Sequence, residues 1–398
     1  MLSILVFIII LGLLIFVHEL GHFVTARRNG IRASEFGFGF PPRVFGVQKI
    51  TDAKTGKSKW RMIWGSRDGD SENEKKDWDE IENKGLLGDT IYSLNWIPLG
   101  GFVKIKGEDG SRKNDKDSFS NKGAWPRIKV LAAGVMMNFL LAWVLLSFVF
   151  MIGAPEVTES SSGAVDKKIQ IAEVLPETPA AAMGLRIGDE VVRSQTAPSG
   201  ETVNLKNVPD LQNYIASHKG QEITFEIKRG GESLELKGTP RTESPEGQGA
   251  LGVALVETSV VSYPWYLAIW KGLEATFNLI VAIITAFFGI LGSLIMGKGA
   301  GADLSGPIGI AVLTKEVTGL GLTYVLQFAA LLSVNLGIIN ALPIPALDGG
   351  RILFVIIEKI KGSPVNQKIE QIFHTVGFVL LIMLMILVTF KDVSKFVN

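Results

Sequence analysis

The most prominent pattern along the chain is a series of long apolar runs separated by polar segments. The first run covers residues 1–24, and its first basic neighbours, Arg27, Arg28 and Arg32, follow it. Because no basic residue precedes the run and no small-residue cleavage pattern follows it, we predict a transmembrane helix rather than a secretory signal peptide. Basic residues concentrate on the cytoplasmic side of a span, so the N-terminus is expected outside.

Further apolar runs predict more membrane helices. Residues 128–153 form the second predicted span, which runs outward because basic residues precede or open it and none occurs in 153–166. These residues are Arg112, Lys113, Lys116, Lys122, Arg127 and Lys129. Residues 322–350 and 372–391 are the third and fourth predicted spans, joined by a cytoplasmic loop at 351–371. Residues 263–300 are apolar as well, but their first turns carry Lys271 and Glu274 among tryptophans, a pattern typical of an interfacial or re-entrant amphipathic helix.

Two polar segments between the runs carry β-type patterns. The cytoplasmic loop 25–127 contains a charged insertion near 66–90 and a glycine-bounded strand at Phe102–Lys106. Residues 160–262 predict an extracytoplasmic mixed domain, with strands at 169–174, 223–228 and 234–237 and a short helix at 211–217. Within it, residues 177–192 resemble the stretch of bacterial PDZ domains in which a short helix precedes a Gly-Asp turn and a strand. A generic β-rich module is the alternative.

Composition narrows the possible chemistry. Hydrophobic residues make up 47% of the 398 residues and the mean hydropathy is +0.30, which excludes a disordered chain and argues against a soluble one. The net charge of +1 gives no basic excess that would suggest a nucleic-acid partner. Cysteine is absent, which excludes disulfides, thiolate metal sites and a cysteine nucleophile. A metal ion would therefore need histidine and carboxylate ligands.

The clearest chemical motif lies inside the first apolar run. His18 and His22 are four residues apart, so on a helix both imidazoles face one side and can bind one ion. Glu19 then lies beside the ion, where it can serve as a general base. A closed structural metal site is the alternative, but it would need four protein ligands. His218 lies in the outer domain and His374 is expected at the interface, so a carboxylate is the expected third ligand.

Asp348 is the expected carboxylate. It follows two prolines, Pro343 and Pro345, which cannot lie in a regular helix interior and are predicted to place it in a turn. Together, the HExxH motif and the run from Asn335 to Gly350 resemble the site-2 protease family of intramembrane zinc metalloproteases. The single PDZ-like segment resembles the branch of that family that contains the bacterial regulator of sigma-E protease.

This resemblance covers the whole chain and implies the roles of particular residues. It implies a Zn²⁺ site formed by His18, His22 and Asp348, with Glu19 as the base. A further family element, Gly134-x-x-x-Asn138-Phe139, makes Asn138 a candidate for holding substrate or the developing oxyanion. The proline common after that glycine is Val135 here, which leaves the local helix geometry open.

The expected fold class is a polytopic α-helical membrane protein with four transmembrane helices, a cytoplasmic-side membrane-associated β-hairpin and one extracytoplasmic PDZ domain. The direction of the spans supports four crossings. The helix that leads to Asp348 must enter the membrane from outside, because Asp348 has to meet the histidines at the inner end of the first span. The location implied is a bacterial plasma membrane, with the active site toward the cytoplasm and the PDZ domain periplasmic or extracellular.

The expected reaction is cleavage of transmembrane segments of membrane proteins, with anti-sigma factors or remnant signal peptides as substrate types. A helical substrate must unwind, and an exposed strand edge could take over its backbone hydrogen bonds. The candidates for that edge are Phe102, Val103, Lys104 and Ile105, and an ordinary hairpin without substrate contact is the alternative. Asn335 and Asn340 could clamp the unwound strand or serve helix packing. The PDZ domain would dock peptide termini or filter substrates by size. A silent scaffold and a metal transporter are the competing functions.

Overall fold

The chain forms two compact units, which are described separately. The computed structural model describes residues 2–52, 54–65, 86–110, 112–157, 167–196, 202–204, 207–230, 232–245, 248–297 and 306–397. The first unit comprises residues 1–145, 273–315 and 328–398, and the second comprises 146–272 and 316–327. Most of the charged insertion predicted near 66–90 lies outside the described residues.

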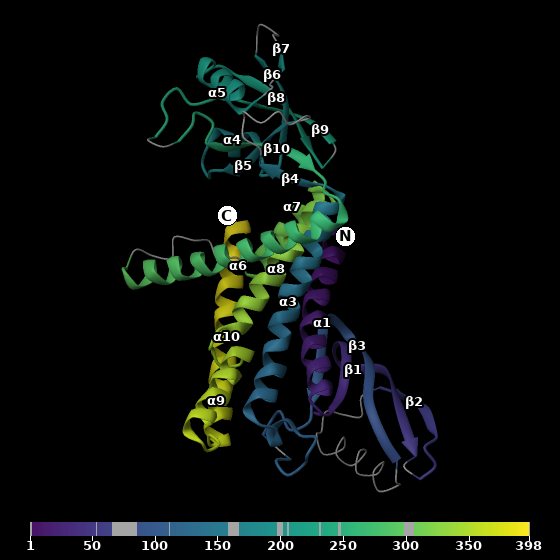
Figure 1. Cartoon of the computed structure of the whole chain (residues 1–398). Helices are drawn as coiled ribbons and strands as arrows, with labels where there is room; N and C mark the ends of the chain where they lie inside the picture. Colours follow the sequence, from purple (N-terminus) through teal and green to yellow (C-terminus); the bar gives the residue numbers. More distant parts are fainter. Residues whose placement is uncertain are drawn as a thin grey trace. The chain divides into compact units, whose positions relative to one another are not determined.

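The first unit contains long apolar helices (Figure 1). Its elements include α1 (Leu2–Arg28), α3 (Ala124–Ile152, up to residue 145), α8 (Leu322–Ala341, from residue 328) and α10 (Gln367–Val397). Also present are α7 (Pro307–Leu320, up to residue 315), the short helix η1 (Phe119–Asn121), and α6 (Trp265–Ile295, from residue 273). Among the described residues, five helices are long and apolar enough to cross a bilayer: α1, α3, α6, α8 and α10. The chain is therefore a multi-pass membrane protein.

The predicted number of membrane crossings depends on whether α6 crosses the bilayer. By length and composition it qualifies as a span like the other four. Figure 1 shows its Leu273–Ile295 part running at a steep angle to α8 and α10 rather than along them. The prediction of four crossings stays a prediction.

The helix that carries Asp348 differs from the sequence prediction. Residues 322–350 do not form one helix, since α8 ends at Ala341 and a new helix, α9 (Asp348–Lys361), begins at Asp348 itself. The predicted break is present at residues 342–347, Asp348 is the first helical residue after it, and the first half of the segment expected as a loop at 351–371 is helical. The physical reason is that the chain restarts a helix directly after Pro343 and Pro345 break the previous one.

Two glycines allow that restart. A Cβ at Gly349 would lie 2.2 Å from the carbonyl oxygen of Leu342, and one at Gly350 would lie 2.2 Å from that of Ile344. Only a residue without a side chain lets the first turn of α9 pack against the broken segment this closely. Asp348 is thereby held between the break and the helix.

A sheet packs against α1 in the same unit. It consists of β1 (Ala33–Asp52), β2 (Ser58–Trp64) and β3 (Leu86–Ile105) in the order β2-β1-β3, so the region is a sheet rather than a lone hairpin. The strand β3 folds back on itself, since Glu35 of β1 lies opposite both Ile91 and Lys104. Residues 101–105 pair with β1 on one side only, and they form an edge of the sheet within the described residues.

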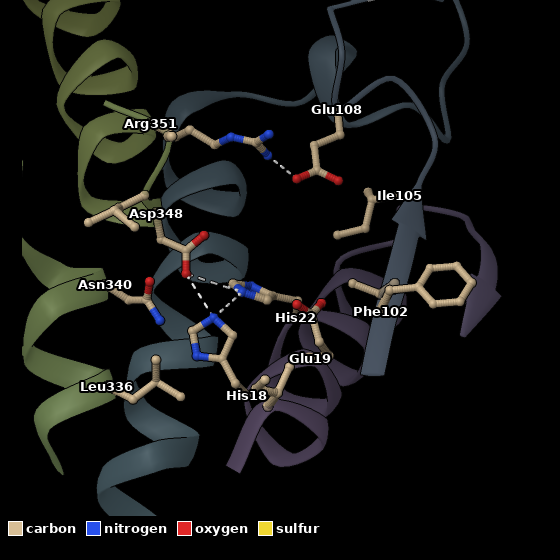
Figure 2. Close-up of a pocket in the computed structure, with 14 residues that line it drawn as sticks. His18, Glu19, His22, Phe102, Ile105, Glu108, Leu336, Asn340, Asp348 and Arg351 are labelled. Carbon is tan, nitrogen blue, oxygen red and sulfur yellow. Dashed lines mark hydrogen bonds and ion pairs between the residues drawn. The ribbon is translucent and has the colours of Figure 1, made fainter. Parts of the chain in front are cut away.

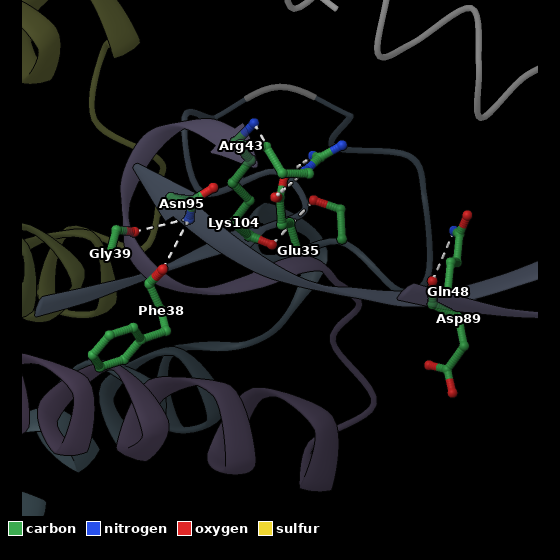
Figure 3. Close-up of polar contacts among 9 residues, drawn as sticks. Glu35, Phe38, Gly39, Arg43, Gln48, Asp89, Asn95 and Lys104 are labelled. Atoms are coloured by element: carbon green, nitrogen blue, oxygen red, sulfur yellow. Dashed lines mark hydrogen bonds and ion pairs between the residues drawn. The ribbon is translucent and has the colours of Figure 1, made fainter. Parts of the chain in front are cut away.

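Polar side chains hold the bends of this sheet (Figure 3). The buried carboxylate of Glu35 accepts two hydrogen bonds from Arg43, at 3.0 and 2.6 Å, and lies 3.6 Å from Nζ of Lys104. The side-chain amide of Asn95 donates to the carbonyl oxygens of Phe38 and Gly39, at 3.4 and 2.9 Å. These contacts fix β1 beside the 101–105 edge. Gln48 similarly donates to the Asp89 carbonyl oxygen, farther along the sheet.

The second unit is a mixed β/α domain. Its strands are β4 (Ala154–Val157), β5 (Lys168–Val174), β6 (Glu190–Thr196), β7 (Thr202–Asn204), β8 (Ile223–Arg229), β9 (Glu232–Gly238) and β10 (Val253–Val261). They form a sheet in the order β4-β10-β5-β6-β8-β9, with β7 beside β6. The helices α4 (Pro179–Met183) and α5 (Val208–Ser217) complete it. The strands predicted at 169–174, 223–228 and 234–237 and the helix at 211–217 are all present.

The core and one ion pair explain the stability of this domain. Ile171, Leu211, Ile223 and Phe225 are almost fully buried at its centre. The buried Asp189 binds the Arg229 guanidinium at 2.7 Å and raises the pKa of that group. The assignment of this domain as PDZ stays a prediction.

Candidate metal centre

Three predicted ligand atoms meet at one point of the first unit (Figure 2). Nε2 of His18 and Nε2 of His22 lie 3.1 Å apart, and Oδ2 of Asp348 lies 3.1 Å from the first and 3.3 Å from the second. Both histidines are buried, and the Asp348 side chain is 17% exposed. The two helices α1 and α9 therefore bring together residues more than 300 positions apart.

These distances fit a metal ion. In a tetrahedral site with metal–ligand distances of about 2.0–2.1 Å, neighbouring ligand atoms lie roughly 3.3 Å apart. Nδ1 of His22 donates to the carbonyl oxygen of Val130 at 2.8 Å, so its Nε2 presents a lone pair to the centre. Two imidazole nitrogens and a carboxylate oxygen that converge this closely form a set of donors suited to a shared cation. The residues present therefore fit a divalent ion held by two nitrogens and one oxygen.

One stripe of α3 supports both histidines. Val130, Gly134 and Asn138 follow one another at intervals of four residues, so they share a helix face. Val130 contacts His22, and Nδ2 of Asn138 lies 3.2 Å from Nδ1 of His18. Gly134 lies between them, where a Cβ would be 2.5 Å from Nε2 of His22. This stripe forms the back wall of the centre.

Close packing of α1 on α3 makes this support possible. A Cβ at Gly21 would lie 2.4 Å from the carbonyl oxygen of Ala133, so α1 and α3 approach each other with their backbones nearly in contact there. The glycine inside the His18–His22 motif thus has a packing role next to the ligands.

Glu19 lies on the open side of the centre. It lines a cavity of about 330 Å³ together with the three ligand residues. The backbone of Val103 lies within hydrogen-bonding range of its carboxylate. The predicted base therefore lies between the metal ligands and the sheet edge, where a bound peptide could reach both.

Some of the predicted substrate-binding residues line this cavity and others do not. Phe102, Val103, Ile105 and Asn340 line it. The residues outside its lining are Lys104, Asn335 and Asn138. Lys104 instead faces Glu35 on the sheet, and Asn138 is fully buried behind His18.

Sequence reasoning missed two charged residues of the cavity. Arg351 of α9 and Glu108, just beyond β3, form an ion pair at the cavity wall (Figure 2). The pair joins the helix of Asp348 to the end of the edge strand. One signal was available: Arg351 follows Asp348 by three residues and shares its helix face.

Sequence reasoning also missed the role of His374. Its Nδ1 accepts a hydrogen bond from the backbone nitrogen of Ala346 at 2.9 Å, and Ala346 has a positive φ of 70°. His374 is half-buried and packs against Phe354 and Phe373 rather than serving only as an interfacial residue. It holds the bend that delivers Asp348. His218, by contrast, caps α5 of the other unit.

Several known proteins are similar in sequence to this chain over nearly its full length. The chain is 30% identical over 476 residues to the zinc metalloprotease RasP of Geobacillus kaustophilus, which covers 99% of this chain and 98% of the relative. It is 32% identical over 382 residues to a putative zinc metalloprotease of Clostridium perfringens, with 96% and 95% coverage. It is 30% identical over 481 residues to the regulator of sigma-E protease RseP of Salmonella typhimurium, with 98% of each chain covered.

A family model agrees with these relatives. The model for Peptidase family M50 matches residues 6–55 and 81–384, which include both histidines, Glu19 and Asp348. The chain belongs to Peptidase family M50.

Proposed function

We propose that this protein is a zinc-dependent endopeptidase that cleaves transmembrane segments of membrane proteins. The observation that carries the proposal is that ligand atoms of His18, His22 and Asp348 lie within 3.3 Å of one another, with Glu19 beside the two histidines on the apolar helix α1. The relatives named zinc metalloproteases support zinc as the ion. A silent scaffold would not need a base at the cavity, and a transporter would need polar groups spread along several spans.

Each residue of the site has its own role in the proposed hydrolysis. Bound zinc would acidify a water molecule and polarise a peptide carbonyl. His18, His22 and Asp348 would hold the ion and leave one position open for that chemistry. The Glu19 carboxylate accepts a proton from the attacking water and delivers it to the nitrogen of the leaving amine.

The sheet edge would hold the substrate. A transmembrane helix hides its carbonyls in its own hydrogen bonds, so it must unwind before cleavage. Residues 101–105 form a sheet edge whose Phe102, Val103 and Ile105 line the cavity, and this position supports strand addition by the substrate. Asn340 on the opposite wall could donate to the same extended segment.

The proposed topology has four crossings, with α6 lying along or re-entering the membrane. The basic residues in and just after the last turn of α1, and those before and in the first turns of α3, support a cytoplasmic location for the sheet and for the active-site end of α1. The domain over 160–262 would then lie outside the plasma membrane of a bacterium. Its proposed identity is a PDZ domain that docks peptide termini or limits substrate size.

The substrate class rests on the relatives. One relative is named a regulator of sigma-E protease and another a regulator of sigma-W protease. Membrane-bound anti-sigma factors are therefore proposed as substrates, and remnant signal peptides are a second type that the same chemistry could accept.

Replacing Glu19 by Gln tests the proposal. The purified full-length variant should retain zinc in the amount that the wild type does, because Glu19 is not a ligand, yet fail to cleave a transmembrane reporter. His18→Ala should lose both zinc and cleavage. Cleavage by Glu19→Gln at the wild-type rate would refute the assigned base, and a wild-type protein that binds no zinc would refute the metal site.

A further inference from the structure

The histidine ligands need a defined tautomer, and the two are supported differently. His22 donates from Nδ1 to a backbone carbonyl, which leaves Nε2 free to bind a metal. His18 has Asn138 at the corresponding position, 3.2 Å from Nδ1. The side chain of Asn138 therefore decides which nitrogen of His18 carries the proton.

The two orientations of the Asn138 amide have opposite consequences. If Nδ2 donates to Nδ1 of His18, the imidazole proton must lie on Nε2, where it would block the metal. If the amide is turned by 180°, Oδ1 accepts from the Nδ1–H group and Nε2 presents its lone pair. Oδ1 of Asn138 is buried and has no hydrogen-bond partner in the first orientation, and the turn would place Nδ2 in that position instead. The choice therefore rests on His18, because only the second orientation leaves the lone pair on Nε2 that a metal ion needs.

The surroundings of Asn138 favour a supporting role over substrate contact. Its side chain is 0% exposed and is not among the residues that line the cavity. Its backbone oxygen accepts a hydrogen bond from Ser333 of α8 at 2.8 Å, and its Cβ lies against Gly337 of the same helix. The residue is thus fixed between α3 and α8, directly behind His18.

We propose that Asn138 is a positioning residue for the metal site. Its amide oxygen accepts the Nδ1 proton of His18 and holds the imidazole with Nε2 toward Asp348 and the ion. This role replaces the direct substrate or oxyanion contact suggested by the sequence motif. It rests on the proposed metal site, and it adds a second support to the one that Val130 gives His22.

The test distinguishes a hydrogen-bond acceptor at residue 138 from a side chain that only fills space. Full-length Asn138→Asp keeps an acceptor oxygen, whereas Asn138→Leu keeps the volume but removes the acceptor. Zinc release from each purified protein would be measured against a chromogenic chelator, together with zinc content by mass spectrometry. Ser333→Ala is the matched control, because it removes a buried hydrogen bond to the same residue without touching its amide.

The expected result is that Asn138→Leu releases zinc about 10–100-fold more readily, as for other lost partners of metal-binding histidines, while Asn138→Asp and Ser333→Ala stay close to wild type. Equal zinc retention by Asn138→Leu, or equal loss by Asn138→Asp, would overturn the proposal. If the leucine variant does not fold, Asn138→Ala takes its place in the comparison.

Measuring activity distinguishes the positioning role from direct contact with the oxyanion. A residue that donates to the oxyanion would lose kcat in Asn138→Asp with its zinc intact, whereas the positioning role predicts that Asn138→Asp retains both. If the wild-type protein itself holds no zinc, the proposed function fails, and that outcome is distinct from failure of the role of Asn138.

Discussion

Gly134 lies directly against His22, so closely that a Cβ at residue 134 would be 2.5 Å from its Nε2, a proposed ligand atom, and 2.7 Å from Nε2 of His18. A separation under 3 Å forces one of the groups to move, and both imidazoles are held by α3 itself. The helix that supports the ligands therefore also restricts the residue at its centre to glycine.

Gly134→Ala is expected to abolish zinc binding and cleavage while leaving the membrane helices intact. The methyl group would push both histidines out of their converging positions. Zinc content of the purified variant, measured by mass spectrometry, checks this. Gly289→Ala is the control, since a Cβ there meets open space on the apolar helix α6. Wild-type zinc content in Gly134→Ala would show that the ligands do not lie as described.

His374→Ala is expected to weaken zinc binding although His374 is not a ligand. The change leaves the backbone nitrogen of Ala346 without its partner, at a cost of about 1–3 kcal/mol, and loosens the bend before Asp348. His374→Asn offers an acceptor at a similar place and should restore much of the affinity. Chelator competition gives the measurement, with His218→Ala as the control. Equal effects of the two alanine variants would contradict the prediction.

Glu35→Ala is expected to destabilise the sheet beside the active site. Removing one partner of a buried ion pair costs about 3–5 kcal/mol, because the Arg43 guanidinium stays behind without its carboxylate. Arg43→Lys should also reduce stability, since lysine cannot reproduce the two parallel hydrogen bonds. Thermal unfolding in detergent and cleavage rates check both, and Arg61→Lys on the exposed face of β2 should be neutral. The prediction fails if Arg43→Lys and Arg61→Lys behave alike.

Val103→Pro is expected to reduce cleavage of transmembrane substrates at least tenfold without loss of zinc. Proline removes the backbone N–H group of the edge, which lies beside Glu19 and lines the cavity. Val103→Ala keeps that group and should retain most of the activity. The two variants would be compared by kcat/KM on one reporter and by zinc content. Full activity of the proline variant would rule out strand addition at this residue.

Much of the fold follows from local patterns. The apolar runs predicted α1, α3, α8 and α10, because each run is long enough to span a bilayer and lies between polar flanks. The break before Asp348 was also predictable from its two prolines. The helix that follows the break was not, since proline ends one helix without determining whether another begins seven residues after the first one ends.

The candidate site, like the fold, was predictable from local sequence patterns only in part. The spacing of His18 and His22 was sufficient to place two candidate ligands on one helix face, because residues four apart share a face in any α-helix. The support of His18 by Asn138 and of Ala346 by His374 depends on contacts between residues that are 120 and 28 positions apart in sequence. Nothing in a local periodicity encodes which residue will face which across such a contact.

The order of residues alone determined that this chain enters a membrane and carries two imidazoles and a carboxylate, the proposed base, on its first helix. Packing decided that Asp348 meets them, that residues 101–105 become an edge of the sheet, and that Arg351 and Glu108 pair at the cavity wall. The reason is physical: helix periodicity and hydropathy act over a few turns, whereas a site formed by distant segments depends on how close their backbones can approach, which here is set by glycines at positions 21, 134, 349 and 350.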